Sequence, residues 1–397
     1  MKDIFSVKWK YGNVFLYISI IACFSIISYY HLKSGFSMAG DSQRFSRWAD
    51  ELIKFNFNFY DFFSIERDDH RPPLFFFSLP VFLMAICKVI FGNEWQFAFL
   101  LLNLLFVFFS LLLFVKCLLL IEVRPLLISL SLSLIVISAD ILTWPKFILS
   151  DMSYAFLVIF ATYFIVRGII KNKINYLELF LIIFLLLASR PSSIPVIFAI
   201  GFFIIISIYQ IFLTPKKILL FLLALFVLTP IFFGLLYLFM EHNVNTKSFD
   251  EVAYQDFVYK YVTNGMIIHG RPETWVDPPN NFIDVVYIYF LRLINFFNPY
   301  ASTFSLIHII LNVIQTFLIL LSVFVWSIFN GYIKFQNKIF FFIIILSFSV
   351  AAFHSFILID YDWRYRFPII LPLIMLSPIS LEMILKKIEL NRSGIKI

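Results

Sequence analysis

The sequence predicts an all-α polytopic membrane protein whose chain crosses the bilayer about ten times. Its repeated apolar runs are long enough to span the hydrocarbon layer. Hydrophobic residues make up 61% of the chain and charged residues only 14%, which excludes a water-soluble globular class. Backbone polar groups inside a bilayer must be satisfied within their own segment, so these runs are expected to be helices.

About ten segments have the length and composition of membrane-spanning helices. The first follows a lysine-rich N-terminus, and its apolar run is longer than the core of a cleaved signal peptide, so we expect a signal anchor. Ser37-Met38-Ala39 is a weak match to a cleavage site and leaves cleavage there as the alternative. The predicted spans are 13–32, 95–118, 125–143, 152–169, 176–189, 191–213, 218–240, 302–329, 339–359 and 367–385.

The apolar segment 73–91 decides the predicted topology, because a crossing there would invert every later loop. If it lies in the interface, the short basic segments between later helices all face the cytoplasm, as the positive-inside rule requires. We therefore predict an interfacial segment with Lys88 extending toward lipid headgroups, both termini in the cytoplasm, and a multi-pass protein of a bacterial plasma (inner) membrane. The basic residues assigned to the cytoplasmic side are Lys116, Arg124, Arg167, Lys171, Lys173, Lys216, Lys217, Lys334, Lys338, Lys386, Lys387, Arg392 and Lys396.

The opposite, external side collects the residues capable of chemistry. Its first loop, 33–94, has the densest charge of the chain, and Phe45, Trp48 and Leu52 recur there at helical spacing with charged residues between them. This pattern predicts an amphipathic helix lying in the interface. A second external loop, 241–301, is predicted to cover the helices as a lid. The chain thus divides into three parts. The first is a transmembrane module, 1–240, which includes the loop 33–94. The second is the lid, 241–301, and the third, 302–397, contains the C-terminal helices and a short basic tail.

Short motifs on this external side occur in a recognisable order. In the first loop they are Gly40-Asp41, His70-Arg71-Pro72-Pro73-Leu74 and Phe91-Gly92-Asn93. Later ones are Ser150-Asp151 at the start of a helix, Ser189-Arg190-Pro191 between two helices, and Arg364-Tyr365 followed by Pro368 and Pro372. In this order they resemble the GT-C glycosyltransferases, closest in pattern to the lipid A aminoarabinose transferases and the protein O-mannosyltransferases. The resemblance covers the first half of the chain and the last external turn.

The resemblance implies a GT-C-like helical bundle and an enzyme of glycan biosynthesis in the cell envelope. Such an enzyme takes a sugar from a polyprenyl-phosphate carrier and transfers it to an acceptor hydroxyl on the external, periplasmic face. By the same resemblance, Asp41 acts as a base or orienting group and Arg71 holds the carrier phosphate. The sequence departs from the family pattern at His70, where an acidic residue is common, and at Arg71, where lysine is common.

The chemistry of such a transfer calls for the same residue types. A hydroxyl that attacks an anomeric carbon needs a carboxylate within hydrogen-bond reach to take its proton, and the reaction inverts the anomeric centre. The phosphate leaving group needs cations, and the planar guanidinium donors of arginine suit it. The residues predicted to be catalytic are Asp41 and Asp151. Those predicted to bind substrate are His70, Arg71, Arg190, Arg364, Tyr365 and Arg366.

Six of these eight residues also have a purely structural interpretation. Asp41 and Asp151 stand at helix starts, where a carboxylate serves as an N-cap. His70 is also typical of a solvated loop residue, and Arg190 of a side chain that extends from an apolar run to the interface. Arg364 and Arg366 have acidic neighbours on their own loop, Asp360 and Asp362, with which they would pair.

Other functions remain as alternatives. An O-antigen-type polymerase is also polytopic and uses polyprenyl-linked sugars, and a lipid-linked sugar flippase or transporter is a third class. The expected partners are the lipid-linked donor, a glycan, lipid or protein acceptor, and membrane lipids. The net charge of +7 is spread over short loops, so no nucleic acid is expected. No cofactor is required by the sequence, although the external carboxylates leave a divalent metal ion open. Cys23, Cys87 and Cys117 lie in apolar runs and are predicted to be buried thiols.

Overall fold

The computed structural model describes residues 2–64, 74–208, 282–300, 304–329, 334–356 and 363–392. Within these ranges the chain is helical and forms no strand; its one bridge of β type pairs Ser37 with Phe147. Six described helices are long and apolar enough to cross a membrane, or seven if one bent pair counts as a single span. The predicted all-α membrane class is confirmed. The larger number of spans stays a prediction, since the expected span 218–240 lies outside the described residues.

The chain forms two compact units. The first comprises Met1–Ile197, Phe317–Ile344 and Phe367–Ile397, and the second comprises Phe198–Thr316 and Ile345–Arg366. The helices wholly in the first unit are α1 (Lys2–Ser34), α2 (Gly40–Lys54), α3 (Phe59–Phe63), η1 (Leu74–Phe77), α4 (Ser78–Phe91), η2 (Gly92–Glu94), α5 (Trp95–Leu120), α6 (Pro125–Val136), α7 (Ala139–Thr143), η3 (Trp144–Lys146), α8 (Asp151–Lys171), α9 (Tyr176–Ser189), η4 (Pro191–Ser193) and α16 (Ile370–Arg392).

The second unit contains α13 (Phe282–Phe297), and four helices contribute residues to both units. These four are α10 (Ile194–Ile208), α14 (Leu306–Phe329), α15 (Lys334–Phe356) and η6 (Trp363–Ile369). Each unit is considered by itself below.

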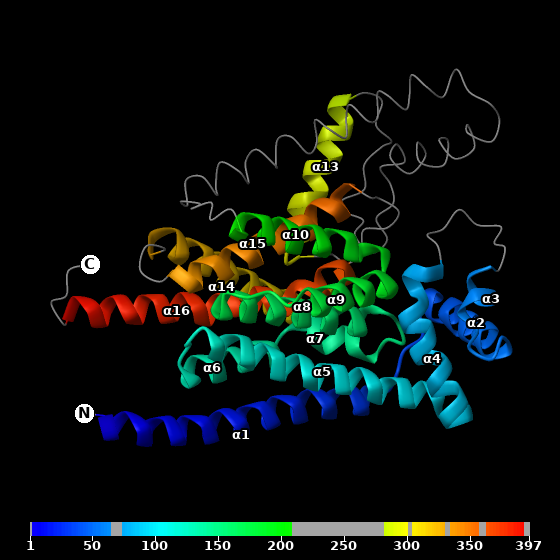
Figure 1. Cartoon of the computed structure of the whole chain (residues 1–397), viewed down its shortest axis with the longest axis horizontal. Helices are drawn as coiled ribbons and strands as arrows, with labels where there is room; N and C mark the ends of the chain where they lie inside the picture. The colour runs from blue at the N-terminus through cyan, green and yellow to red at the C-terminus, as the bar shows by residue number, and fades with distance from the viewer. Residues whose placement is uncertain are drawn as a thin grey trace. The chain divides into compact units, whose positions relative to one another are not determined.

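In the first unit, α5 packs against α8, and α6 packs against both α1 and α16. Figure 1 shows the N-terminus of α1 and the C-terminal end of α16 at the same end of this bundle. Ion pairs join the turn between α5 and α6 to the same part of α16: Arg124 Nε lies 3.2 Å from Glu382 Oε1, and Arg124 Nη2 lies 2.8 Å from Glu389 Oε2. The placement of both termini on one side of a membrane stays a prediction, and so does the identity of that side.

The amphipathic helix predicted in the first external loop is present as α2. It buries Phe45, Ala49 and Leu52 against α4, where Val81 and Met84 are fully buried. Its charged residues Arg47 and Lys54 are exposed, as expected for a helix that separates an apolar layer from water. Removing these side chains from water is what holds α2 on α4.

The prediction that Lys88 extends toward lipid headgroups is wrong. The Lys88 ammonium donates to Asp50 Oδ1 at 2.7 Å and to the Ser46 carbonyl oxygen at 2.9 Å, both on α2, and it lies 4.9 Å from the centre of the Trp95 ring. The carboxylate and the carbonyl are one helical turn apart and face α4, so they compensate the charge where it is largely buried. Lys88 therefore fastens α4 to α2.

The helical stretch Leu74–Leu120 is 47 residues long, more than twice what a bilayer needs. It turns at Gly92, whose φ of +51° is a conformation that glycine adopts at little cost. Figure 1 draws α4 steeply across the direction of α5. This course suits the predicted interfacial position of segment 73–91, which stays a prediction.

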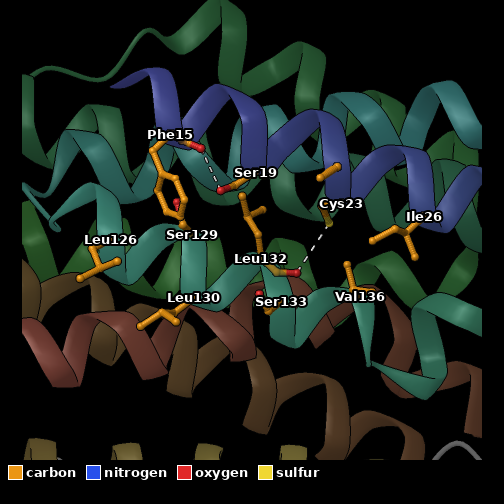
Figure 2. A pocket seen from close by; sticks show the side chains of 11 residues that line it. Phe15, Ser19, Cys23, Ile26, Leu126, Ser129, Leu130, Leu132, Ser133 and Val136 are labelled. Atoms are coloured by element: carbon orange, nitrogen blue, oxygen red, sulfur yellow. Dashed lines mark hydrogen bonds between the residues drawn. The ribbon is translucent and has the colours of Figure 1, made fainter. Parts of the chain in front are cut away.

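A groove of about 210 Å³ lies between α1 and α6. Figure 2 shows its lining, in which Ser19 and Cys23 of α1 face Ser129 and Ser133 of α6. Small side chains at this spacing let two membrane helices approach closely, and Cys23 Sγ lies 3.6 Å from the Leu132 carbonyl oxygen. The groove contains none of the residues predicted for the site.

The three native cysteines allow a direct test of topology. Cys23, Cys87 and Cys117 are all buried and unpaired, so a membrane-impermeant maleimide should leave the native protein unlabelled. A cysteine introduced at exposed Asn93 should be labelled from outside intact cells, and one at exposed Asn172 only after the membrane is opened. Labelling of position 172 in intact cells would contradict the predicted orientation.

Candidate active site

The start of the loop 33–94, which is predicted to be external, is fixed to a distant part of the chain. The Ser37 N–H donates to the Lys146 carbonyl oxygen at 2.9 Å, and the Ile148 N–H donates to the Ser37 carbonyl oxygen at 3.1 Å. Asp41 follows shortly after Ser37, and Asp151 shortly after Ile148. Both predicted catalytic carboxylates therefore lie on segments joined by backbone hydrogen bonds.

Asp41 lies in the first turn of α2 and is not its N-cap. The N-cap is Ala39, whose N–H donates to Ser42 Oγ at 2.9 Å. The Asp41 carboxylate forms an ion pair with Arg44, one turn later, and Arg44 also lies 5.7 Å from the centre of the Trp48 ring. A carboxylate in this position is favoured by the helix dipole. The side chains of Asp41 and Arg44 are 27% and 24% exposed, so the pair is reachable from water.

The predicted span 125–143 is broken. The α6 helix ends at Val136, Ser138 is extended, and the chain continues as α7 and η3 at an angle of 52° to α6. Irregular backbone at membrane depth is tolerated only where protein or water satisfies its polar groups. The bend is thus a feature that the apolar composition alone does not reveal.

Two buried side chains supply hydrogen bonds at this bend. His31 Nε2 donates to the Ile141 carbonyl oxygen at 2.9 Å, and Asn103 Nδ2 donates to the carbonyl oxygens of Pro145 and Phe147 at 3.0 and 3.1 Å. Neither residue was among those predicted for the site. The available signal was Pro145 in an apolar run, because proline there predicts freed carbonyls that need donors.

Asp151 and Arg190 form a buried ion pair. Asp151 opens α8 but is not its N-cap, which is Ser150, and Arg190 stands in extended backbone before Pro191. Arg190 Nη1 donates to Asp151 Oδ1, and the two residues are 9% and 2% exposed. Arg190 therefore does not extend to the interface, and a carboxylate compensates its charge. The roles predicted for both residues in catalysis and binding stay predictions.

A second contact secures the same junction. The Tyr154 hydroxyl donates to the Ser192 carbonyl oxygen at 2.6 Å, and both residues are buried. Together with the ion pair, this bond fixes the start of α8 to the turn between α9 and α10. The two contacts therefore restrict movement of these segments relative to each other.

The remaining predicted site residues fall elsewhere. In the second unit, buried Arg366 donates to Asn312 Oδ1 at 3.1 Å, the Tyr365 ring stacks on His354 at 4.2 Å, and Arg364 lies 5.5 Å from the centre of the Tyr365 ring. The acidic partners suggested for Arg364 and Arg366, namely Asp360 and Asp362, lie outside the described residues. The predicted site residues His70 and Arg71 also lie outside them. The structure thus joins the segments of Asp41, Asp151 and Arg190, and the other assignments stay predictions.

In the described ranges, no group of three His, Cys, Asp or Glu side chains is arranged to hold a metal ion. Comparisons with known proteins found no matching family model, no matching curated protein and no matching solved structure.

Proposed function

We propose that this protein is a glycosyltransferase of the bacterial plasma membrane that moves a sugar from a polyprenyl-phosphate carrier to an acceptor hydroxyl on the external face. The observation that carries the proposal is the position of Asp41. Its carboxylate is partly exposed in the first turn of an amphipathic helix, next to the backbone pairing of Ser37 with 146–148. A base for a membrane-bound sugar donor needs such a place, between apolar helices and water.

In the proposed reaction, the acceptor oxygen attacks the anomeric carbon as its proton passes to the Asp41 carboxylate. The bond between the anomeric carbon and the phosphate oxygen breaks, and the polyprenyl phosphate leaves with the electron pair. One bond forms and one breaks at the anomeric carbon, so its configuration is inverted. Arg44 orients the carboxylate through their ion pair.

The other predicted residues have supporting roles in this proposal. Asp151 acts by holding Arg190 at the junction of α9 and α10, which positions the external ends of these helices. The roles predicted from the sequence are kept in the proposal: Arg71, Arg364 and Arg366 as sources of positive charge for the leaving phosphate, and His70 and Tyr365 as contacts to the sugar or the acceptor. Guanidinium groups suit this task because each offers paired donors to phosphate oxygens.

The test is a transfer assay with purified protein in detergent and a panel of radiolabelled polyprenyl-phosphate sugars, followed as carrier hydrolysis or sugar transfer. Asp41→Asn is expected to lower turnover about 100-fold or more, the scale of losing a general base. Glu51→Gln is the matched control, because Glu51 lies on the same helix and pairs only along the surface with Lys54 at 2.5 Å. Full turnover of a folded Asp41→Asn protein would show that Asp41 is not the base.

A further inference from the structure

The cations described around the external end of the first unit are mostly neutralised by nearby acids. Arg44 pairs with Asp41 and Arg190 with Asp151, while Lys88 pairs with Asp50 and Lys54 with Glu51. A phosphate brought to these cations has to compete with a carboxylate that is already in place. The structure therefore directs attention to a cation without such a partner.

Lys146 is such a cation. It is the last residue of η3, its side chain is half-buried, and it forms no ion pair with any carboxylate in the part of the chain described here. Its ammonium lies 5.7 Å from the centre of the Phe147 ring. Partial burial of an unpaired ammonium is unfavourable unless water or an anion compensates the charge.

The place of Lys146 is fixed by its main chain. Its carbonyl oxygen accepts the N–H of Ser37, at the start of the loop that carries Asp41, and Asn103 holds the residues on either side of it. The main chain of Lys146 is thus held at the junction of the two segments that carry the predicted catalytic carboxylates.

A second, independent observation comes from His31. Its imidazole is fully buried; Nε2 donates to the Ile141 carbonyl, while Nδ1 has no hydrogen-bond partner among the described residues. Because Nε2 carries the proton, Nδ1 is an acceptor that needs an O–H or N–H donor. His31 is bonded to Ile141, five residues before Lys146 in the same bend, and the Lys146 carbonyl is bonded to Ser37, six residues after His31. A cation and an unsatisfied acceptor therefore occupy one neighbourhood.

These two groups match the chemistry of a phosphate ester. An anionic phosphate oxygen would compensate the Lys146 ammonium, and a hydroxyl of the same ligand, directly or through one water, would donate to His31 Nδ1. Charge-assisted hydrogen bonds of this type are the strong ones, and lysine binds phosphate as a point charge. A polyprenyl-phosphate sugar carries both groups next to each other.

We propose that Lys146 binds the phosphate of the lipid-linked donor, with His31 as the neighbouring hydrogen-bond acceptor. This inference rests on the proposed transferase function and adds to it a phosphate contact that lies outside the arginine set. It also explains why the bend between α6 and α8 is joined to the loop of Asp41: the join brings the leaving phosphate toward the base.

The test measures binding, which does not depend on turnover. Protein in phosphatidylcholine nanodiscs is titrated with polyprenyl phosphate that carries no sugar, and Kd is obtained by calorimetry. Lys146→Met is expected to raise Kd about tenfold or more, and Lys146→Arg to keep it within about threefold, because only the former loses the charge-assisted bond. Lys33→Met is the matched control, since Lys33 is an exposed lysine near the end of α1, over the Tyr29 ring. Equal elution and melting temperature establish that the variants are folded.

Each possible result of these measurements supports or contradicts the proposed role of Lys146. An unchanged Kd in Lys146→Met overturns the inference. Inorganic phosphate is the second probe: binding of it as tight as that of the lipid, and lost in Lys146→Met, would mean a free-phosphate site and would overturn the donor assignment. If no sugar is transferred from any donor while binding of polyprenyl phosphate still depends on Lys146, the transferase proposal fails and the lipid-phosphate site stands. If transfer depends on Asp41 but Lys146→Met leaves KM unchanged, the Lys146 inference is contradicted and the transferase proposal stands.

Discussion

Replacing Arg190 by methionine is expected to lower the free energy of unfolding by about 3–5 kcal/mol, the usual cost of leaving a buried ion without its partner. Asp151, 2% exposed, would lose the guanidinium that compensates its charge. Thermal unfolding in detergent, followed by intrinsic fluorescence, should show the loss as a clearly lower Tm. A change within the error of the measurement would mean that the pair does not hold this junction together.

The double variant is the informative control. Asp151→Leu combined with Arg190→Met replaces both charges with apolar groups, and such replacements in other proteins are often neutral or stabilising. We therefore expect the double variant to recover most of the lost stability. Recovery of stability without recovery of turnover would separate the structural role of the pair from its predicted part in the reaction.

The long helices were predictable because length and hydropathy are local properties of the chain. The predicted spans 95–118 and 152–169 correspond to α5 (Trp95–Leu120) and α8 (Asp151–Lys171) within two residues at each end. The amphipathic α2 followed from the helical spacing of its apolar residues, which needs no knowledge of the rest of the fold. In both cases the deciding interactions lie within one turn or one segment.

The errors arose where a residue's partner is distant in sequence. Lys88 was assigned to the headgroups because its partner Asp50 is 38 residues away, on another helix. The structural alternative for Arg190, extension to the interface, overlooked Asp151 because that partner is 39 residues away. A charged residue at the edge of an apolar run has the same local sequence whether it reaches water or pairs inside the protein.

The bend after α6 was also not predicted, because the backbone there depends on partners that are distant in sequence. Composition allowed a continuous helix over 125–143, and the break depends on donors from two other helices, with His31 lying 110 residues before Ile141. A single sequence shows such donors only as isolated polar residues in apolar spans. Their role as hydrogen-bond donors can be recognised only when the carbonyl oxygens to which they donate are known.

Asn103→Leu is the second change with a large expected effect. The substitution removes both donors to the carbonyl oxygens of Pro145 and Phe147, in a region that water does not reach freely. The Phe147 carbonyl oxygen keeps the Leu149 N–H at 3.0 Å, whereas the Pro145 carbonyl oxygen loses its donor. A buried carbonyl without a partner costs about 1–3 kcal/mol, so the free energy of unfolding should fall by about 2 kcal/mol. Part of the cost is offset because the Asn103 Oδ1 atom, which has no hydrogen-bond partner within the described ranges, is removed as well.

Ser110→Ala is the matched control for this change. Ser110 is also buried on α5, and its hydroxyl makes no hydrogen bond in the described structure, so its loss should alter stability by no more than about 0.5 kcal/mol. The two variants differ in whether the polar group serves the bend. Equal destabilisation by both would show that any polar loss inside α5 weakens the protein.

The Asn103 variant should also impair function more than its stability loss accounts for. The carbonyls that Asn103 holds flank Lys146, whose own carbonyl is bonded to Ser37, so a shifted bend would move the predicted phosphate contact relative to Asp41. At a temperature where Asn103→Leu is still fully folded, Kd for polyprenyl phosphate should rise, whereas Ser110→Ala should keep the native value. An unchanged Kd in folded Asn103→Leu would mean that the bend and the phosphate site are independent.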